Sequence, residues 1–503
     1  MPRYAITTFG CQMNVHDSDR MHEVLLGAGY TRGIGPEDVD VVVLNTCSVR
    51  EKAEQKLRSE VGRMALLKRR RRDLVLVVAG CVAQQEGERL LKEMRGIDLI
   101  VGPDNIPELP RLLDDLALGG VPVARTVFDT ENPRFLTALT TTAGSPTAFV
   151  TIMKGCDERC SFCIVPHTRG PERYRPSDDV IAEIAALAAS GVREVTLLGQ
   201  TVNSYRDPQG ALPRAPGAAE DDPDESGFAA LLRRIAADVP GLARLRYTSP
   251  HPRHLTPSLI RAHADLAVLP RHVHMPVQSG SDRVLKRMIR RYTRAEYVAR
   301  ARALVEGAPG LTLSTDIIVG FPGETADDFE ATLSLVQEVG FKGLFGFKYS
   351  QRPYTPARKL DDDVPEAEKS ARLTRLFELS EALLGEHLGT MLGTTQRVLV
   401  EGPSKADRAG SLCGRTERNE IVHIKDVAGL ALVGEIVPAT IVRANRHSLE
   451  AELTSEARAA ARPIGVDHGG SAPSRQAELH PHDPGPAPGR RSLPVMASAP
   501  GDR

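Results

Sequence analysis

Three cysteines lie close together in the segment KGCDERCSFCIVPHTRG, residues 154–170, where Cys156, Cys160 and Cys163 have the spacing C-x3-C-x2-C. Three thiolates on one short loop can bind three irons of a [4Fe–4S] cluster and leave the fourth iron open to a ligand. The alternative is a Cys3His zinc site that includes His167. Because the loop follows a predicted strand in a βα series, where barrel enzymes place their active sites, we favour the iron–sulfur cluster.

Three more cysteines follow predicted strands near the N-terminus. Cys11 follows YAITTFG, Cys47 follows DVVVLNT, and Cys81 follows LVLVVAG. The carboxyl ends of neighbouring parallel strands share one edge of a sheet, which is the usual place for a ligand. Burial of three unrelated cysteines is the alternative, but the three equivalent positions favour a second three-cysteine cluster site. Cys413 has no other cysteine nearby in the sequence and is predicted to be an unliganded thiol.

The composition excludes several classes of protein. The 64 lysines and arginines nearly balance the 65 aspartates and glutamates, so any RNA-binding surface must be local. Seven cysteines in 503 residues are too few for a disulfide scaffold, and their odd number favours metal binding or catalysis. No apolar run reaches the length of a membrane helix and the N-terminus has no signal-peptide pattern, so we predict a cytoplasmic protein without a membrane span.

The order of strand and helix patterns predicts an α/β protein of about three domains. Residues 1–130 repeat a β-branched strand, a turn and a helix, which predicts a parallel sheet. Residues 131–146 lose this pattern and are predicted to be a linker. Residues 147–380 contain six further strand patterns, with helical patterns between most of them, which predicts a partial (β/α)6 barrel. Within it, the Pro-, Gly- and acid-rich residues 206–227 are predicted to form a solvated loop.

The C-terminal region has a different pattern. Short strand patterns separated by turn residues follow a helical segment and predict a small OB-like β-barrel over residues 385–453. Residues 456–503 are rich in Pro, Gly, Ser and His and are predicted to form a disordered tail. The most basic run, KRRRR at 68–72, is interpreted as a solvated helix end.

These motifs carry a resemblance to a known family. The C-x3-C-x2-C loop, with the aromatic Phe162 before its last cysteine, resembles that of the radical S-adenosylmethionine superfamily. The two sets of three cysteines and the terminal small barrel are similar in their order to the methylthiotransferase family, over about residues 3–453. The segments TFGCQMNVHDSDR, LNTCSVREKAEQK, VAGCVAQQEG and MPVQSGSDRVLKRMIRRYT resemble its tRNA-modifying subgroup. The segment RPYTPARKL, after the last predicted barrel strand, differs from the Pro-Gly-Thr-Pro-Ala sequence that is more usual in this family.

The resemblance implies two [4Fe–4S] clusters and S-adenosyl-L-methionine as cofactors. Cys156, Cys160 and Cys163 would hold the catalytic cluster, whose open iron binds the cofactor so that one electron cleaves it to methionine and a 5′-deoxyadenosyl radical. A second cluster, which holds or delivers the sulfur, would be bound by Cys11, Cys47 and Cys81. The resemblance also places six residues at the cofactor, namely Phe162, Gly199, Gln200, Gln278, Ser279 and Asp316. For the polar ones, a turn or a helix cap is the alternative role.

The activity implied by the resemblance is methylthiolation of carbon 2 of N(6)-isopentenyladenosine beside the anticodon of tRNA, with two S-adenosylmethionine molecules per product. The implied partners are this tRNA, bound in part by the C-terminal TRAM domain, an electron donor such as a flavodoxin or ferredoxin, and a sulfur or cluster carrier. A monomer is expected. Two alternatives change the acceptor to threonylcarbamoyladenosine in tRNA or to an aspartate of a ribosomal protein, and the residues around Cys11 and Cys47 speak against both. The third alternative is a non-catalytic iron–sulfur redox protein, although such proteins normally supply four cysteines per cluster.

Overall fold

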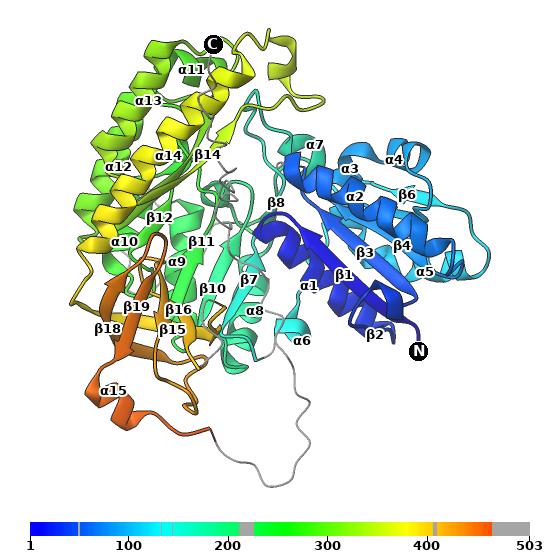
Figure 1. Ribbon diagram of the computed structural model, residues 1–503, viewed down its shortest axis with the longest axis horizontal. Helices are drawn as coiled ribbons and strands as arrows, with labels where there is room; N and C mark the ends of the chain where they lie inside the picture. Colours follow the sequence, from blue (N-terminus) through cyan, green and yellow to red (C-terminus); the bar gives the residue numbers. More distant parts are fainter. Residues whose placement is uncertain (49–50, 132, 143, 211–225, 406–409, 465–503) are drawn as a thin grey trace, which may run out of the picture. The chain divides into compact units, whose positions relative to one another are not determined.

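A six-stranded parallel sheet forms the N-terminal part of the computed structural model, which describes residues 1–48, 51–131, 133–142, 144–210, 226–405 and 410–464 (Figure 1). Its strand order is β2-β1-β3-β4-β5-β6. The bounds are β1 (Arg3–Phe9), β2 (Thr31–Arg32), β3 (Val41–Thr46), β4 (Val75–Gly80), β5 (Leu99–Val101) and β6 (Val123–Arg125). The predicted parallel sheet is confirmed. Strands β2, β5 and β6 escaped the sequence prediction because each has only two or three residues.

Helices cover both faces of this sheet, because alternate strand residues face opposite sides. α1 (Gln12–Gly27) and α5 (Leu109–Ala117) share one core with Val41 and Val43, whereas α2 (Glu51–Lys68) shares another with Val42 and Leu44. α3 (Cys81–Glu86) and α4 (Glu88–Glu93) follow β4, and 3-10 turns span Pro36–Asp38 and Pro103–Glu108. The basic run begins at the last residue of α2, so its interpretation as a helix end is confirmed.

All six strands predicted within residues 147–380 form, but they pair in two parallel sheets of three rather than in one. One sheet has the order β11-β10-β7, with β7 (Thr147–Thr151), β10 (Glu194–Leu198) and β11 (Arg244–Tyr247). The other has the order β12-β13-β14, with β12 (His272–His274), β13 (Thr312–Val319) and β14 (Gly343–Lys348). The intervening helices are α8 (Ser177–Ala189), α9 (Gly227–Asp238), α10 (Pro257–Asp265), α12 (Arg294–Gly307) and α13 (Ala326–Val339). One hydrophobic core contains residues of both sheets, so the two halves form a single domain.

The connections between these strands contain short elements. β8 (Met153–Lys154) pairs antiparallel with β9 (Arg173–Tyr174), and α7 (Val165–Arg169) lies between them in the sequence. The others are α11 (Asp282–Arg287) and 3-10 turns at Val202–Ser204, Pro252–His254 and Pro356–Lys359. The predicted linker is not free of structure, since it contains the short helix α6 (Leu139–Thr142). Of the predicted loop 206–227, residues 211–225 lie outside the described residues.

A closed five-stranded barrel follows the long helix α14 (Glu366–Gly389), which confirms the predicted small barrel. Its order is β15-β16-β17-β19-β18, with β15 (Thr395–Pro403), β16 (Leu412–Arg415), β17 (Ile421–Ile424), β18 (Ile436–Ala444) and β19 (Leu449–Leu453). The first residues of the predicted tail are not disordered, because Ser455–Ala460 forms α15 behind the N-cap of Thr454. Residues 465–503 lie outside the described part of the chain. None of the described helices is long and apolar enough to cross a membrane.

The C-terminal barrel is bound through buried polar contacts to β11, to the segment before β14 and to α14. The Arg244 guanidinium donates to the carbonyl oxygens of Arg397 at 2.8 Å and Arg415 at 2.9 Å. Glu420 forms ion pairs with Lys342 at 3.1 Å and with His387 at 2.8 Å. Arg244 and Glu420 are both buried, so these bonds form in an interior setting where an unpaired partner would be costly.

Candidate active site

The three N-terminal cysteines lie at the ends of three neighbouring strands. Strands β1, β3 and β4 are paired in register through Phe9, Thr46 and Gly80. Cys47 and Cys81 directly follow the ends of β3 and β4, and Cys11 follows β1 after one glycine. The Cys47 backbone N–H donates to the Phe9 carbonyl at 2.9 Å, which extends the ladder by one residue. The predicted gathering of these residues at one sheet edge is confirmed.

Small residues allow the backbones to approach closely at this edge. A Cβ atom on Gly10 would lie 2.7 Å from the Cβ of Cys47. One on Gly80, whose φ is +91°, would lie 2.3 Å from Oδ1 of Asn45. Asn45 in turn donates to Ser18 at 2.9 Å and accepts from Asn14 at 3.2 Å, which ties the start of α1 to β3. The close packing of these strand ends therefore fixes the relative positions of Cys11, Cys47 and Cys81.

Charge is distributed unevenly among these thiols. The hydrogen bond with Cys47 lowers the pKa of Cys11 to about 6, whereas burial raises the pKa of Cys81. Arg169, at the end of α7, donates from Nε to the Cys81 sulfur at 3.3 Å and pairs with Asp17 at 2.5 Å. Sequence reasoning missed Arg169, because nothing in HTRG indicates contact with a cysteine 88 residues earlier.

The C-x3-C-x2-C loop begins with a tight turn after β8. Gly155 has a φ of +80°, and a Cβ atom there would lie 1.9 Å from the Pro171 carbonyl oxygen, so only glycine fits. The Cys156 N–H donates to the Gly170 carbonyl at 3.1 Å. Further along, the Ser161 N–H donates to Met288 at 2.9 Å, so the loop is fixed at both ends to separate parts of the domain.

Two thiols of this loop, those of Cys156 and Cys160, are buried, and that of Cys163 is partly buried. Burial raises the pKa of Cys156 to about 11 and that of Cys163 to about 12. Cys156 Sγ lies 3.1 Å from the Thr201 hydroxyl, and Arg290 donates from Nη1 to Cys160 Sγ at 3.3 Å. A metal centre would supply the positive charge that converts the buried thiols to thiolates.

Both cysteine sets fit a cluster better than a single metal ion. Among the described residues, Glu158, His251 and His254 form the only group of three or more candidate ligands whose ligand atoms all lie within 4.8 Å of one another. Neither cysteine set is that compact, and His167 joins no such group in the described chain. A cube that binds each thiolate at a separate iron needs a wider spacing than a tetrahedral zinc ion. The described residues of the loop therefore show no preformed Cys3His zinc site.

Glu158 lies in the loop itself, between Cys156 and Cys160, whereas His251 and His254 come from the segment after β11. One carboxylate oxygen of Glu158 lies 2.9 Å from His254 Nε2 and 3.3 Å from the Arg253 guanidinium. Chiefly through the His254 bond, the pKa of Glu158 falls to about 2. Because a guanidinium already neutralises this carboxylate, a divalent cation is disfavoured there, and the contacts fix the loop against the segment after β11.

Two of the predicted cofactor-binding residues lie directly against the loop. The Gln200 side-chain oxygen accepts from the Gly155 N–H at 2.5 Å, while its buried Nε2 has no hydrogen-bond partner in the described structure. A Cβ atom on Gly199 would lie 2.5 Å from the Met153 side chain. Gln200 thus offers an unused donor beside the cysteines, which suits a bound polar ligand.

The other predicted cofactor-binding residues have different surroundings. Phe162 packs against a small core that includes Met288 and Phe321. Asp316 pairs with His274 at 3.3 Å, and Gln278 adopts a φ of +76° where it bridges to β13. These three residues come from the loop, from β13 and from the segment after β12, so the fold brings them to the same domain without showing a shared ligand.

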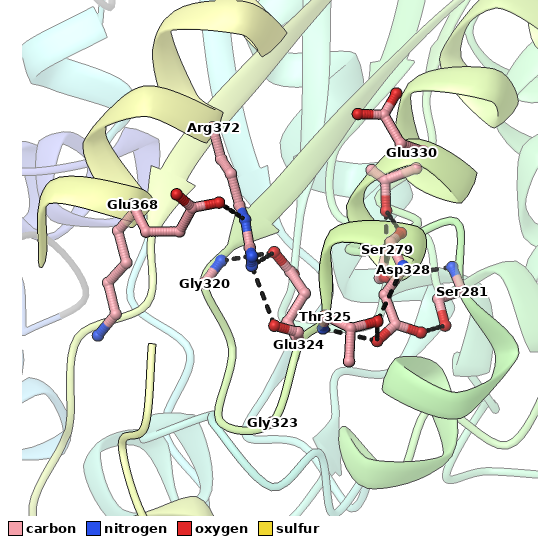
Figure 2. A network of polar contacts seen from close by, with 12 residues as sticks. Ser279, Ser281, Gly320, Gly323, Glu324, Thr325, Asp328, Glu330, Glu368 and Arg372 are labelled. Atoms are coloured by element: carbon pink, nitrogen blue, oxygen red, sulfur yellow. Dashed lines mark hydrogen bonds and ion pairs between the residues drawn. The ribbon is translucent and has the colours of Figure 1, made fainter. Parts of the chain in front are cut away.

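Ser279 is fully buried and its hydroxyl is used by the protein. It lies 3.4 Å from the Thr332 hydroxyl of α13 and accepts from the Ser281 N–H at 3.2 Å. Figure 2 shows it beside Ser281 and Asp328, in the polar network at the start of α13. These contacts favour the alternative role for Ser279, which is to join the segment after β12 to α13. Cys413 lies on β16 and belongs to neither cysteine site.

Three protein-family models match successive parts of the chain. A model described as "Uncharacterized protein family UPF0004" matches residues 3–102, that of the radical SAM superfamily matches residues 150–336, and that of the TRAM domain matches residues 389–454. The radical SAM match covers all three cysteines of the loop, and the first match covers the three N-terminal ones.

The chain is also similar to curated proteins along its length. The tRNA-2-methylthio-N(6)-dimethylallyladenosine synthase of Sorangium cellulosum is 72% identical, over 99% of each chain. The enzyme of the same name from Bordetella petrii is 46% identical, over 89% of this chain and 90% of its own. Among solved structures, the radical S-adenosylmethionine methyltransferase TsrM of Kitasatospora setae has a TM-score of 0.48 and 16% identity, over 71% of this chain and 75% of its own, a likeness too weak to assign a shared mechanism.

Proposed function

Because the chain belongs to the family of the tRNA-2-methylthio-N(6)-dimethylallyladenosine synthases, we propose that it transfers a methylthio group to carbon 2 of N(6)-isopentenyladenosine beside the anticodon of tRNA. One observation carries the proposal: two separate sets of three cysteines lie in one unit, and Arg169 connects them by donating to Cys81 from the helix after the C-x3-C-x2-C loop. A simple iron–sulfur carrier normally supplies four cysteines to each cluster, whereas each of these sets has three.

We propose the following roles for the residues of the two sites. Cys156, Cys160 and Cys163 would hold a [4Fe–4S] cluster with an open iron, and Cys11, Cys47 and Cys81 would hold a second cluster. When bound, the first cluster with S-adenosylmethionine supplies the one-electron chemistry that activates a carbon–hydrogen bond, and the protein positions the reactants. Gln200 would donate its unused Nε2 hydrogens to the cofactor, while Gly155 and Gly199 allow the neighbouring segments to pack closely against the loop.

The inner face of sheet β12-β13-β14 is proposed to receive the adenine base. Phe345 and Phe347 on β14 are 39% and 37% exposed. Gly346 between them faces α14, since a Cβ atom there would lie 2.8 Å from Leu373, so the two rings point to the opposite side. Asp316 is the cross-strand neighbour of Phe345. Exposed aromatic rings stack on unpaired bases, and an anticodon-loop base can leave its stack without melting a helix.

The remaining parts of the proposal concern the domains and the partners. The domains would be residues 1–130 with the second cluster, residues 147–380 with the radical chemistry, and residues 385–453 as the RNA-binding barrel. A flavodoxin or ferredoxin would supply the electron, and a sulfur or cluster carrier would restore what is consumed. We expect the protein to act as a monomer in the cytoplasm.

Mass analysis of tRNA nucleosides from a strain that lacks the protein tests the proposal. The expected result is loss of the methylthio group with the isopentenyl group retained. Expression of the intact chain should restore the product, whereas the Cys11→Ala, Cys47→Ala, Cys81→Ala variant should not. Loss of the methylthio group from threonylcarbamoyladenosine would contradict the proposed acceptor. So would unchanged tRNA together with loss of a modification from a ribosomal protein. Either result would still agree with methylthio transfer as the reaction.

A further inference from the structure

Each of the two cysteine sites contains one sulfur that accepts a hydrogen bond from a buried arginine. In the C-x3-C-x2-C loop, Arg290 Nη1 donates to Cys160 Sγ at 3.3 Å. At the edge of the N-terminal sheet, Arg169 Nε donates to Cys81 Sγ, also at 3.3 Å. Both arginines are 5% exposed. Two permanent positive charges are therefore held away from water, each beside an atom proposed to bind iron.

The charge of Arg290 faces its cysteine without a competing anion. Its Nε donates to the Tyr292 hydroxyl at 2.9 Å and its Nη2 donates to the Pro276 carbonyl at 2.8 Å. Tyr292 is fixed in turn, since its hydroxyl donates to Val277 at 2.8 Å. The hydrogen-bond partners of Arg290 in the described part of the chain are thus a phenol, a peptide carbonyl and a thiol, with no carboxylate among them.

The charge of Arg169 is shared with a carboxylate. Asp17 of α1 accepts from both of its terminal nitrogens, at 3.3 Å and 2.5 Å. Arg169 comes from the helix after the C-x3-C-x2-C loop, whereas Asp17 and Cys81 come from the N-terminal part, so this arginine acts across the two parts. A separate ion pair between Lys154 and Asp104, at 3.0 Å, joins the same two parts. Loss of Arg169 alone should therefore leave them attached.

We propose that Arg290 and Arg169 are positioning residues that raise the reduction potential of the cluster on their own three cysteines. This inference rests on the proposed function, which assigns a cluster to each site. Reduction adds one negative charge to a [4Fe–4S] cluster, and hydrogen bonds or positive charge at its sulfurs stabilise the reduced form. Low exposure strengthens the effect, because water no longer screens the charge. Arg290 should have the larger influence, since Asp17 offsets the charge of Arg169.

The test measures the reduction potential of each cluster separately, by electron paramagnetic resonance of anaerobic samples poised at a series of potentials. The full-length chain is loaded with iron and sulfide in a Cys11→Ala, Cys47→Ala, Cys81→Ala background, which isolates the loop cluster, or in a Cys156→Ala, Cys160→Ala, Cys163→Ala background, which isolates the other. Arg290→Gln should lower the potential of the loop cluster, and Arg169→Gln should lower that of the N-terminal cluster by a smaller amount. The Lys variants, which keep the charge, should fall between Gln and the parent chain.

The cross-combinations serve as matched controls. Arg290→Gln should not move the potential of the N-terminal cluster, and Arg169→Gln should not move that of the loop cluster. Unchanged potentials at normal iron content, or equal shifts of both clusters in one variant, would overturn the inference. So would loss of iron from both the Gln and the Lys variant of one arginine, which would show a purely structural role. No tRNA is present in these measurements, so a wrong acceptor would leave their outcome intact.

Discussion

A buried thiol binds iron only after losing its proton, and the two sites face this requirement differently. In the loop, burial raises the pKa of Cys156 to about 11 and that of Cys163 to about 12, which favours their protonated forms. In the N-terminal set, the hydrogen bond with Cys47 lowers the pKa of Cys11 to about 6, which favours its thiolate, whereas burial raises the pKa of Cys81. At the scale of residues, the two sets of cysteines therefore differ in the pKa of their thiols. Because each set is proposed to hold its own cluster, removing one set should abolish a different step from removing the other.

Replacing each set of cysteines by alanine tests this distinction. The Cys156→Ala, Cys160→Ala, Cys163→Ala variant should form no 5′-deoxyadenosine under reductant, because no open iron remains to bind S-adenosylmethionine. The Cys11→Ala, Cys47→Ala, Cys81→Ala variant should still cleave the cofactor and yield no methylthio nucleoside. Iron should fall from about eight to about four atoms per chain in either variant. Modified tRNA from the second variant would show that its cysteines merely fill a core.

Gln200 offers a test of cofactor binding at a single atom. Gln200→Glu keeps the oxygen that accepts from the Gly155 N–H and replaces the buried Nε2 donor by a second oxygen. Loss of a hydrogen bond to a charged ligand costs about 1.5–3 kcal/mol, so Kd for S-adenosylmethionine should rise by about tenfold or more. Equilibrium dialysis with the cluster-loaded protein measures this change. Gln209→Glu, at an exposed position, is the control, and an unchanged Kd at Gln200→Glu would remove this residue from the site.

At the scale of elements, a capping box formed by Thr325 and Asp328 fixes the start of α13. The carboxylate of Asp328 also binds Ser281, the N-cap of α11. Asp328 accepts from the N–H and hydroxyl of Thr325, both at 2.8 Å, and from the Ser281 hydroxyl at 2.5 Å (Figure 2). Burial raises the pKa of Asp328, but the bonds from Arg283, Ser281 and Thr325 outweigh it and lower the pKa overall. One carboxylate thus joins α11, α13 and the loop after β13.

Asp328→Asn should lower the stability of the protein by about 1–2 kcal/mol at pH 7, through loss of the cap and of charged hydrogen bonds. Because the pKa of Asp328 is lowered in the folded state, its contribution is complete above the unfolded pKa of about 3.9 and is lost as the pH falls below it. Thermal unfolding midpoints of variant and parent should therefore differ at pH 7 and converge below about pH 4. The control is Glu330→Gln on the same helix, α13. It breaks an exposed ion pair with Arg375 of α14 and should change the stability by less than about 1 kcal/mol. A difference that persists undiminished below pH 4 would contradict the assignment.

The sequence predicted most strands and helices whose hydrophobic pattern extends over several residues. The three long N-terminal strands have runs of β-branched residues, and the six barrel strands have short apolar patterns between helical segments; all nine were found. β16 has four residues, LCGR, without alternation, and α15 follows a cap in a segment whose composition indicated disorder. The division of the barrel strands into two sheets depends on side-chain packing between elements far apart in sequence, so no local pattern could show it.

The candidate site was predictable to the extent that its chemistry lies in sequence spacing. The cysteines and Gln200 were proposed as site residues because they follow predicted strands, and ligands gather at strand ends. Arg169 and Arg290 were not, since an arginine in a polar segment looks like a solvated residue until folding buries it. For Ser279 the sequence left both a ligand and a turn or cap role open, and only the folded structure shows that its hydroxyl contacts Thr332 and Ser281.

At the scale of the whole molecule, the C-terminal barrel is more than an attached RNA-binding module. Buried Arg244 donates to two of its backbone carbonyls, and Lys342 pairs with its Glu420. Removing the barrel would leave these cations without partners in a partly buried setting, which is costly. The barrel therefore contributes to the stability of the domain that carries the chemistry.

Truncation before β15, at Thr390, should lower the thermal unfolding midpoint of the remaining chain and reduce cleavage of S-adenosylmethionine, even though no cysteine of either site is removed. Truncation after residue 464 is the control and should change neither quantity, because the deleted residues 465–503 contain too few apolar groups to build a core. Calorimetry and 5′-deoxyadenosine assays measure the two effects. An unchanged midpoint with loss of tRNA affinity alone would identify the barrel as an independent module.

The strand ladder that ends at Phe9, Thr46 and Gly80 has a consequence for how the protein is matured and repaired. In a zinc finger the ligands have no fixed places until the metal arrives, so the free energy of metal binding is also the free energy of folding. Here, backbone hydrogen bonds between β1, β3 and β4 set the places of Cys11, Cys47 and Cys81 without any metal. The chain should fold before it is loaded, and a cluster dismantled during turnover could be reassembled on a protein that never unfolds. Circular dichroism spectra of the iron-free and iron-loaded forms should then agree.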